Sequence, residues 1–362
     1  MSAAEDERLR RRRLRSQLLT GPPADSPEAV VGRLLAVQAQ DGRGFRLAVR
    51  SRSRGLTAHD VDTALGDARL VVTWLNRGTL HLVRAEDYWW LHRLTAPRVL
   101  PGVRTRLRGL GVGAHDEELG VTVVVDALGA EGPLTRLQLR DRLDAAGVPT
   151  AGQALVHVLA AASLRGLVVR GPVADGHHAF VSVESWLGRP PRSGDRDDDL
   201  DRLARRYLVG HGPATPADLA AWAGATLGGA RRAIDGIGDD LREVGGGAVP
   251  ADHPPRAIAP RRARLLGPFD PVLHGWASRA PFVGPHSSVV TTNGIFRASC
   301  LVGGRVVGTW TLPAGGPVLD LLEKVDDADR EALTADARDV VRFLGHHGGA
   351  ATFVGDHIGS TG

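Results

Sequence analysis

Two glutamines separated by one residue, Gln38 and Gln40, are the side chains of this sequence whose type and spacing best suggest chemistry. A neutral amide accepts hydrogen bonds through its oxygen and donates two through its nitrogen, but it is not a strong base. A pair of amides is suited to steadying a positive charge or a water molecule. We therefore predict that Gln38 and Gln40 are catalytic toward a substrate that already carries its own positive charge.

The backbone around the pair decides whether both amides reach one site. On a regular helix, residues two apart point about 200° apart, whereas an extended or turning backbone projects them to the same side. An apolar helical stripe begins after Ser26 and Pro27, a typical N-cap and first helical residue, and runs through Val37. Gly42 and Gly44 follow, so we expect the helix to unwind at the pair. Helix capping, or contact with a hairpin, is the alternative role of the amides.

Other catalytic and metal-binding patterns are absent from the sequence. It has no Walker loop, no His-Glu-x-x-His, no nucleophile elbow and no cluster with metal-ligand spacing. Cys300 is the sole cysteine, which excludes a disulfide framework, a zinc finger and an iron–sulfur cluster. We therefore predict either a mechanism without a metal or a cofactor, or no catalytic mechanism. Asp41, directly after Gln40, is the alternative candidate for a base that activates water.

The composition is that of a globular protein of two or three domains, with 362 residues, 43% of them apolar and 24% charged. Nearly all basic residues are arginine, as a GC-rich genome would also produce, and the net charge is only +4. An anion-binding surface must therefore come from segregated charge. The basic run at 8–15 lacks the apolar stretch of a signal peptide, and no run is long enough for a membrane span. We expect a soluble, cytoplasmic protein.

Helices followed by a β-hairpin, the winged-helix pattern, are predicted in the first part of the chain. The β-rich run Leu70 to Leu75 turns at Asn76-Arg77-Gly78 and returns from Thr79 to Val83. Before it lie a helix after Ser26 and a short helix that Thr57 caps. The basic run at the N-terminus is either a DNA-contacting arm or a solvated terminus.

The same pattern recurs twice. The step Gly-Pro-x-Thr occurs at 132–135 and again at 212–215, each time before a capped helix. An apolar helix from Ala154 to Leu164 leads to a hairpin formed by 167–170 and 179–183. We predict an α+β, mainly helical protein with domains at 1–116, 117–190 and 191–362. The last domain carries a β-rich extension with strands 289–292, 297–302 and 306–312, a Gly303-Gly304 turn and a final helix 329–344.

Four stretches, spread from the first section to the last, match a known family in their order. They are Val37-Gln38-Ala39-Gln40, Arg77 to Val83, Leu265 to Asp270, and Asn293 to Phe296 leading to Gly303 to Trp310. Together they resemble the AlkZ/YcaQ family of winged-helix DNA glycosylases. The family's motif is glutamine, an apolar residue, then glutamine or aspartate. Gln38-Ala39-Gln40 is similar to the AlkZ-like branch, with Ala39 smaller than the usual apolar residue.

The resemblance implies three tandem winged-helix units that form a C-shaped cradle for duplex DNA. It also implies release of alkylated purines, and unhooking of interstrand crosslinks by some members. An N7-alkylated purine is already cationic, so it leaves without a general acid while positive charge develops on the sugar. Amide oxygens aimed at that charge, or at the attacking water, stabilise the transition state. An undamaged base must be protonated before it leaves, and neutral amides do little to promote this. The enzyme would therefore be selective for damaged bases.

Hairpin tips and helix N-termini are expected to hold the DNA. The residues predicted to bind it are Arg77, Thr79, His81, Arg231 and Arg232. The expected partner is duplex DNA with alkylated purines, bound by a monomer, with no membrane partner. The alternatives are a winged-helix transcription regulator without activity, and a scaffold that binds proteins. Three questions stay open: which adduct is physiological, whether the damaged base is flipped out of the duplex, and whether the role is self-resistance or general repair.

Overall fold

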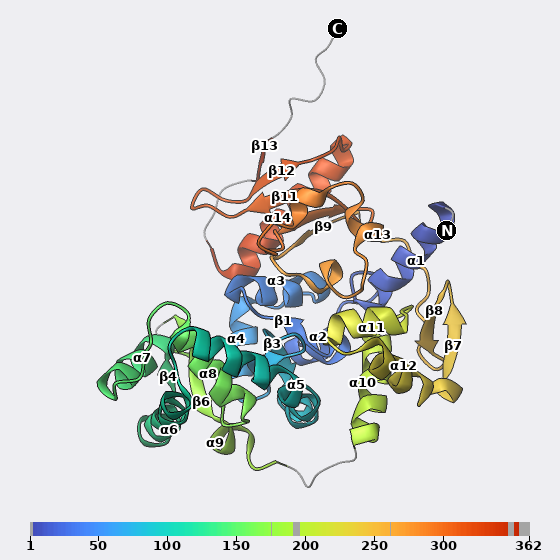
Figure 1. Ribbon diagram of the computed structural model, residues 1–362. Coiled ribbons are helices and arrows are strands. Elements are labelled where there is room, and N and C mark those ends of the chain that lie inside the picture. The colour runs from blue at the N-terminus through green and yellow to red at the C-terminus, as the bar shows by residue number, and fades with distance from the viewer. Residues whose placement is uncertain (1–2, 175, 191–195, 261, 347–350, 355–362) are drawn as a thin grey trace. The chain divides into compact units, whose positions relative to one another are not determined.

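The computed structural model describes residues 3–174, 176–190, 196–260, 262–346 and 351–354. Contacts between residues divide the chain into two compact units (Figure 1). Met1–Val61 and Asp201–Gly362 form one, called here the discontinuous unit, and Asp62–Leu200 form the other, the continuous unit. This division does not follow the predicted boundaries at 116 and 190. The three winged-helix domains stay a prediction, because a grouping by contacts does not identify repeats.

The continuous unit combines helices with one antiparallel sheet. Its helices are α5 (Tyr88–Gly109), α6 (Ala114–Glu131), α7 (Arg136–Ala145), α8 (Ala154–Leu164) and α9 (Val183–Leu187), with a short 3-10 turn η1 (Ala85–Asp87). Its strands, in their order across the sheet, are β3 (Thr79–Arg84), β2 (Leu70–Leu75), β5 (Val168–Ala174), β6 (His177–Ser182) and β4 (Leu134–Thr135). Fully buried Val124, Leu139, Leu143, Val158 and Leu159 form the centre of its core.

The discontinuous unit begins with helices α1 (Ala3–Ser16), α2 (Pro27–Leu34) and α3 (Gly42–Arg52) and the short strand β1 (Val37–Gln38). Two helices contain the points where the chain passes between the units, α4 (Ala58–Gly66) and α10 (Arg196–His211). Next come α11 (Pro216–Ala223), α12 (Leu227–Asp235), η2 (Gly238–Asp240) and the hairpin β7 (Leu241–Val244) and β8 (Gly247–Pro250). A single bridge joins Ala214 to Ala248, so this hairpin is tied to the segment before α11.

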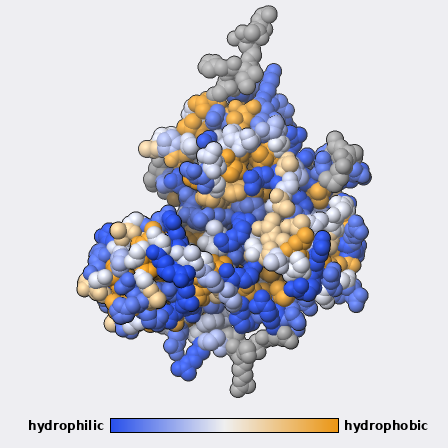
Figure 2. All heavy atoms as spheres, in the orientation of Figure 1, coloured by the Kyte–Doolittle hydropathy of each residue, from blue (hydrophilic) through white to orange (hydrophobic). Residues whose placement is uncertain are grey.

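A five-stranded sheet completes the discontinuous unit (Figure 1). Its order is β13 (Thr352–Val354), β12 (Val318–Leu321), β11 (Arg305–Thr311), β10 (Ser299–Val302) and β9 (Ala263–Leu266). The long helix α14 (Asp327–Leu344) packs against β9, and η3 (Pro271–Leu273), α13 (Ala280–Val283) and η4 (Ser287–Val289) lie between β9 and β10 in the chain. Figure 2 shows apolar residues at the surface over this sheet.

Several local predictions are confirmed, along with the α+β, mainly helical class. Ser26 caps α2 by accepting a hydrogen bond from the Ala29 amide at 3.2 Å. Thr135 and Thr215, the last residues of the two Gly-Pro-x-Thr steps, both form capping boxes at the starts of α7 and α11. The hairpins β2–β3, β5–β6 and β10–β11 lie where the sequence predicts them. Caps and hairpin turns depend on a few neighbouring residues, so they can be predicted without knowledge of the tertiary packing.

Other predictions are wrong, each for a physical reason. The predicted strand 289–292 is instead the end of η4 followed by one bridge between Val290 and Phe296, because no neighbouring strand continues the pairing. The helix α2 ends at Leu34, although its apolar stripe runs on through Val37. Long α5 was not predicted, and it contains Pro97 and Pro101.

The basic N-terminal run is not a solvated, frayed terminus, and its contact with DNA stays a prediction. It forms α1, where Leu9 and Leu14 are buried. Arg13 is also buried and pairs with Asp218 at 3.1 Å. The run therefore anchors α1 to the start of α11 within the discontinuous unit.

Candidate functional site

The two glutamines lie in an extended stretch between two helices. Leu35 has a φ of 67°, a left-handed conformation that stops α2, and β1 then covers Val37–Gln38. The next helix, α3, begins at Gly42. The predicted change from helix to extended backbone at the pair is therefore confirmed. Gly42 and Gly44 lie in the first turn of the next helix, however, and are not the cause of the break.

The two side-chain amides face each other. Gln38 Nε2 donates a hydrogen bond to Gln40 Oε1 at 2.5 Å. Gln38 is 3% exposed, whereas Gln40 is exposed. The other polar atom of Gln38, Oε1, is buried without a hydrogen-bond partner among the residues that the structure describes. A buried acceptor left unsatisfied costs about 1–3 kcal/mol, so a donor or a positive charge placed beside this oxygen would be stabilised.

Asp41 has a structural task at the same site. Its Oδ1 accepts a hydrogen bond from the Gly44 amide at 2.6 Å, which caps the start of α3. A carboxylate at a helix N-terminus is also favoured by the helix dipole. The cap fixes the backbone directly after Gln40. The hypothesis that Asp41 activates water stays a prediction.

The first turn of α3 is held by a close approach of two backbones. A Cβ atom on Gly44 would lie 2.4 Å from the carbonyl oxygen of Pro268, and one on Gly267 would lie 2.8 Å from the Cβ of Leu47. Only glycine leaves room for this contact. The stretch at 265–270, which carries part of the family resemblance, thus meets the capped turn that follows the Gln38–Gln40 motif.

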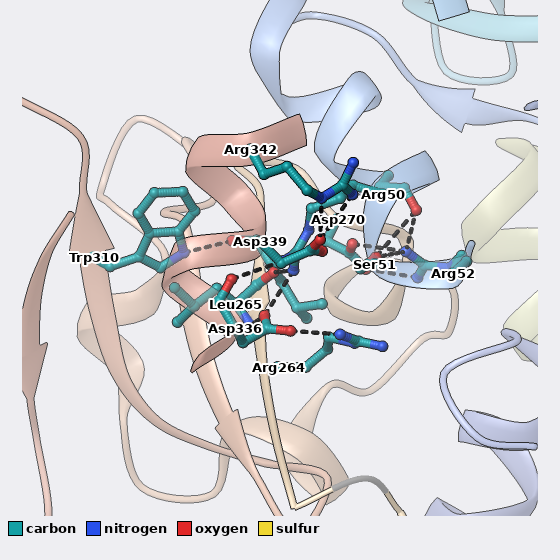
Figure 3. A network of polar contacts seen from close by, with 12 residues as sticks. Arg50, Ser51, Arg52, Arg264, Leu265, Asp270, Trp310, Asp336, Asp339 and Arg342 are labelled. Atoms are coloured by element: carbon teal, nitrogen blue, oxygen red, sulfur yellow. Dashed lines mark hydrogen bonds and ion pairs between the residues drawn. The ribbon is translucent and has the colours of Figure 1, made fainter. Parts of the chain in front are cut away.

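Buried ion pairs hold the other end of α3 (Figure 3). Arg50 donates to Asp336 Oδ2 and to the Leu265 carbonyl oxygen, both at 2.7 Å. Arg52 makes two hydrogen bonds to the Asp270 carboxylate, at 2.8 and 2.9 Å. Both arginines are almost fully buried. Buried charges need partners, and sequence reasoning missed that two of the four arginines of α3 are buried with theirs.

Asp336 is charged despite its burial. Burial acts to raise its pKa, but Arg50 and Arg264 together outweigh this and hold the pKa below its usual value. The Leu265 amide donates to the same carboxylate at 2.7 Å. In addition, Trp310 Nε1 donates to the Leu266 carbonyl oxygen at 2.9 Å (Figure 3). The helix α14, the sheet and the C-terminal end of α3 are therefore joined by buried polar contacts.

Three of the predicted DNA-binding residues belong to the continuous unit. Arg77 is exposed at the tip of the β2–β3 hairpin, and Thr79 is half-buried beside it. His81 is only 3% exposed. Its Nδ1–H donates to the Thr79 carbonyl oxygen at 2.9 Å, and Asn76 Nδ2 lies 3.5 Å from its Nε2. The imidazole thus braces the hairpin that presents Arg77, and its contact with DNA stays a prediction.

The other two predicted DNA-binding residues belong to the discontinuous unit. Arg231 and Arg232 are exposed on α12, whose first turn is capped by Thr226. Along the described parts of the chain, no group of three or more His, Cys, Asp or Glu side chains is placed to hold a metal ion. The helices described are all too short or too polar to cross a membrane.

Comparisons with known proteins agree with this arrangement. A family model described as DNA glycosylase AlkZ-like matches residues 31–343. A curated relative from Streptomyces sahachiroi, named interstrand DNA cross-link repair glycosylase, is 28% identical over 355 residues, which cover 92% of this chain and 95% of the relative. The solved structure of Streptomyces sahachiroi DNA glycosylase AlkZ is 26% identical, with a TM-score of 0.79, and the match covers 96% of this chain and 99% of that chain. The predicted resemblance is confirmed, and the chain belongs to the AlkZ-like DNA glycosylase family.

Proposed function

We propose that this protein is a monofunctional DNA glycosylase that releases cationic N7-alkylpurines from duplex DNA, with Gln38 and Gln40 as its catalytic pair. Interstrand crosslinks joined through such purines belong to the same substrate class, in line with the name of the relative from Streptomyces sahachiroi. Membership of a glycosylase family favours an enzyme over a transcription regulator or a scaffold. The observation that carries the proposal is the Oε1 of Gln38, which is buried and has no hydrogen-bond partner in the described part of the chain, while the nitrogen of the same amide donates to Gln40.

The reaction needs little help because the substrate is pre-activated. The bond between C1′ of the sugar and N9 breaks, and its electron pair moves to N9, which neutralises the purine cation. Positive charge develops on the sugar, water then adds to C1′, and a proton is released to solvent. The oxygen of Gln38 stabilises the developing cation or orients the water, and Gln40 keeps that oxygen in position. A few kcal/mol of such stabilisation corresponds to about a hundredfold in rate or more.

Selectivity for damage follows from this weak catalysis. An undamaged purine leaves only after protonation, and a neutral amide does not supply a proton of suitable acidity. The site as proposed therefore accelerates loss of a base that carries a positive charge and leaves normal bases in place. Arg77, Arg231 and Arg232 are proposed to contact the DNA backbone, and the protein is proposed to act as a monomer.

A direct test is base release from defined duplexes. The protein is incubated with a duplex that carries one N7-methylguanine, and with the same duplex without damage. We expect release of N7-methylguanine well above the spontaneous rate, and none from the undamaged duplex. A duplex with a crosslink through two N7-alkylguanines should be converted to separate strands. No release from the methylated duplex under conditions where it is bound contradicts the proposal.

A further inference from the structure

A small cavity with two basic side chains lies between the first turn of α3 and the end of α14, within the discontinuous unit. It has a volume of about 180 Å³, and Arg43 and His346 line it together with Leu312, Pro313 and Val341. None of its described lining residues is acidic. A concave site with positive charge and no carboxylate attracts an anion. The volume is below the roughly 300–1,000 Å³ of sites that hold drug-sized ligands, so a compact anionic group fits best.

Arg43 is an arginine that the fold itself does not use. It is exposed in the first turn of α3, where the helix dipole opposes a cation. Within the described parts of the chain, no ion pair or hydrogen bond holds its guanidinium. The nearby carboxylate of Asp41 is occupied as the cap of the helix, with the Gly44 amide as its donor. A planar guanidinium left available at a cavity is suited to two-pronged contact with a phosphate group.

His346 faces the same cavity from a fixed backbone. Gly345 ends α14 with a φ of 69°, and the His346 amide donates to the Val341 carbonyl oxygen at 3.1 Å. The imidazole has an N–H donor in both its neutral and its charged form. The ion pair of Arg50 with Asp336 at 2.7 Å joins α3 to α14. The two elements that carry the basic side chains are therefore held together before a ligand binds, which reduces the cost of ordering the site.

The cavity lies next to the Gln38–Gln40 motif. Arg43 follows Gln40 by three positions and lines both this cavity and a larger pocket, which Asp41 also lines. In a DNA strand every sugar has a phosphate on each side. A phosphate held by Arg43 therefore fixes how far the adjoining sugar lies from the two amides.

We propose that Arg43 and His346 bind one phosphodiester group of the damaged strand in this cavity, and that Arg43 thereby positions the sugar of the lesion at the glutamine pair. The inference rests on the proposed function and adds a positioning residue to it. Both side chains are exposed, so their replacement should leave the fold intact. Arg46 provides the matched control, because it lies one turn further along α3 and lines neither pocket.

The test neutralises the phosphates near the lesion one at a time. Duplexes carry one N7-methylguanine on a 2′-fluoro sugar, which slows base release, and one methylphosphonate in either the damaged or the opposite strand. We expect one methylphosphonate of the damaged strand to weaken wild-type binding about tenfold. Arg43→Ala should weaken binding of the unmodified duplex by a similar factor and lose the sensitivity to that methylphosphonate, because the two changes remove one contact. Arg43→Lys should restore part of the affinity, since the charge returns without the planar fork.

Two further variants show whether the contact is specific to the cavity. His346→Ala should reduce the sensitivity to the same methylphosphonate, with a smaller loss of affinity than Arg43→Ala. Arg46→Ala removes one positive charge from the same helix and should keep the full sensitivity at every position.

The outcomes separate the phosphate site from the catalytic proposal. If Arg43→Ala keeps the wild-type sensitivity at every position, or loses it only for the opposite strand, the assignment is overturned. A loss that Arg43→Ala and Arg46→Ala share equally overturns it as well, because it reflects net charge alone. If the sensitivity is lost as expected but a duplex with an ordinary sugar keeps its methylated base, the phosphate site holds and the proposed activity fails.

Discussion

The side-chain amide nitrogen of Gln38 donates a hydrogen bond to the amide oxygen of Gln40 at 2.5 Å. The two residues are two positions apart in the chain, and this bond makes them a single unit. The bond removes the rotational freedom of the Gln38 amide and leaves its own oxygen buried without a partner among the described residues. A pre-oriented acceptor stabilises a developing positive charge without reorganisation at the moment of reaction. The short extended stretch at Val37–Gln38, between α2 and α3, makes this arrangement possible.

Gly44→Ala should impair the site through the backbone. The new Cβ would lie 2.4 Å from the Pro268 carbonyl oxygen, so the first turn of α3, and with it the Asp41 cap, must shift. We expect base release to fall by about tenfold or more, with DNA binding retained. The matched control is Gly42→Ala, whose Cβ meets only the end of the Arg46 side chain at 3.6 Å. Similar release rates for the two variants would show that the close approach does not position the loop.

Arg52→Met should destabilise the fold strongly. Arg52 and Asp270 are both 0% exposed, so the substitution leaves a buried carboxylate without its partner. We expect a loss of about 3–5 kcal/mol in the free energy of unfolding, measured by denaturant titration. Arg262→Met removes the ion pairs of an exposed arginine with Asp326 and Asp329, and should change the free energy of unfolding much less. A small effect of Arg52→Met would contradict the role assigned to the network.

His211 should make the stability depend on pH. Burial lowers its pKa to about 3, and its ring stacks on Tyr207 with centroids 4.6 Å apart. The folded protein favours the neutral ring of His211. The contribution of His211 to the free energy of unfolding is therefore complete above the ordinary histidine pKa of about 6.5, and it falls by roughly 1.4 kcal/mol per pH unit below that pH.

The measurement for His211 is the free energy of unfolding at a series of pH values between neutral and acid. His211→Phe should flatten the decline below the ordinary histidine pKa, because the phenyl ring keeps the stacking but does not titrate. His177→Phe, at an exposed position of β6, should keep the wild-type slope. An unchanged pH dependence in His211→Phe would show that the imidazole is not the titrating group.

Arg77→Ala should weaken DNA binding without sequence preference. Arg77 is exposed at the tip of the β2–β3 hairpin, where a guanidinium is suited to phosphate. Loss of one phosphate contact should reduce the slope of log affinity against log salt concentration by about 1. Arg189→Ala, which removes an exposed arginine paired with Glu184 in the same unit, should leave the slope unchanged. Equal slopes for both variants and the wild type would exclude Arg77 as a contact.

The sequence predicts the local parts of this structure well. Caps such as Ser26 and Thr215 and turns such as Gly303-Gly304 depend on a few neighbouring residues. The glutamine pair was found because an extended backbone brings alternate side chains to one side. The hydrogen bond between the two amides, by contrast, depends on side-chain rotamers that the amino-acid sequence does not specify.

Long-range features could not be derived in the same way. The approach of Gly44 to Pro268 and the pairing of Arg52 with Asp270 join residues more than two hundred positions apart. The stripe of apolar residues through Val37 predicts a longer helix, yet the positive φ of Leu35 ends it, because tertiary packing overrides the periodicity. A pocket that Asp41, Phe296 and Trp310 line cannot be found in the sequence, because its walls come from the start of α3, the segment between β9 and β10, and the strands β11, β12 and β13.

The most direct test of the account is single-turnover release of N7-methylguanine from a duplex by Gln38→Ala and Gln40→Ala. The account predicts a loss of about a hundredfold or more for each variant, with DNA affinity and thermal stability close to those of the wild type. Gln153→Ala, which removes an exposed glutamine that accepts a hydrogen bond from Arg106, should release the base at the normal rate. Normal release by both active-site variants would contradict the central claim that this amide pair carries the chemistry.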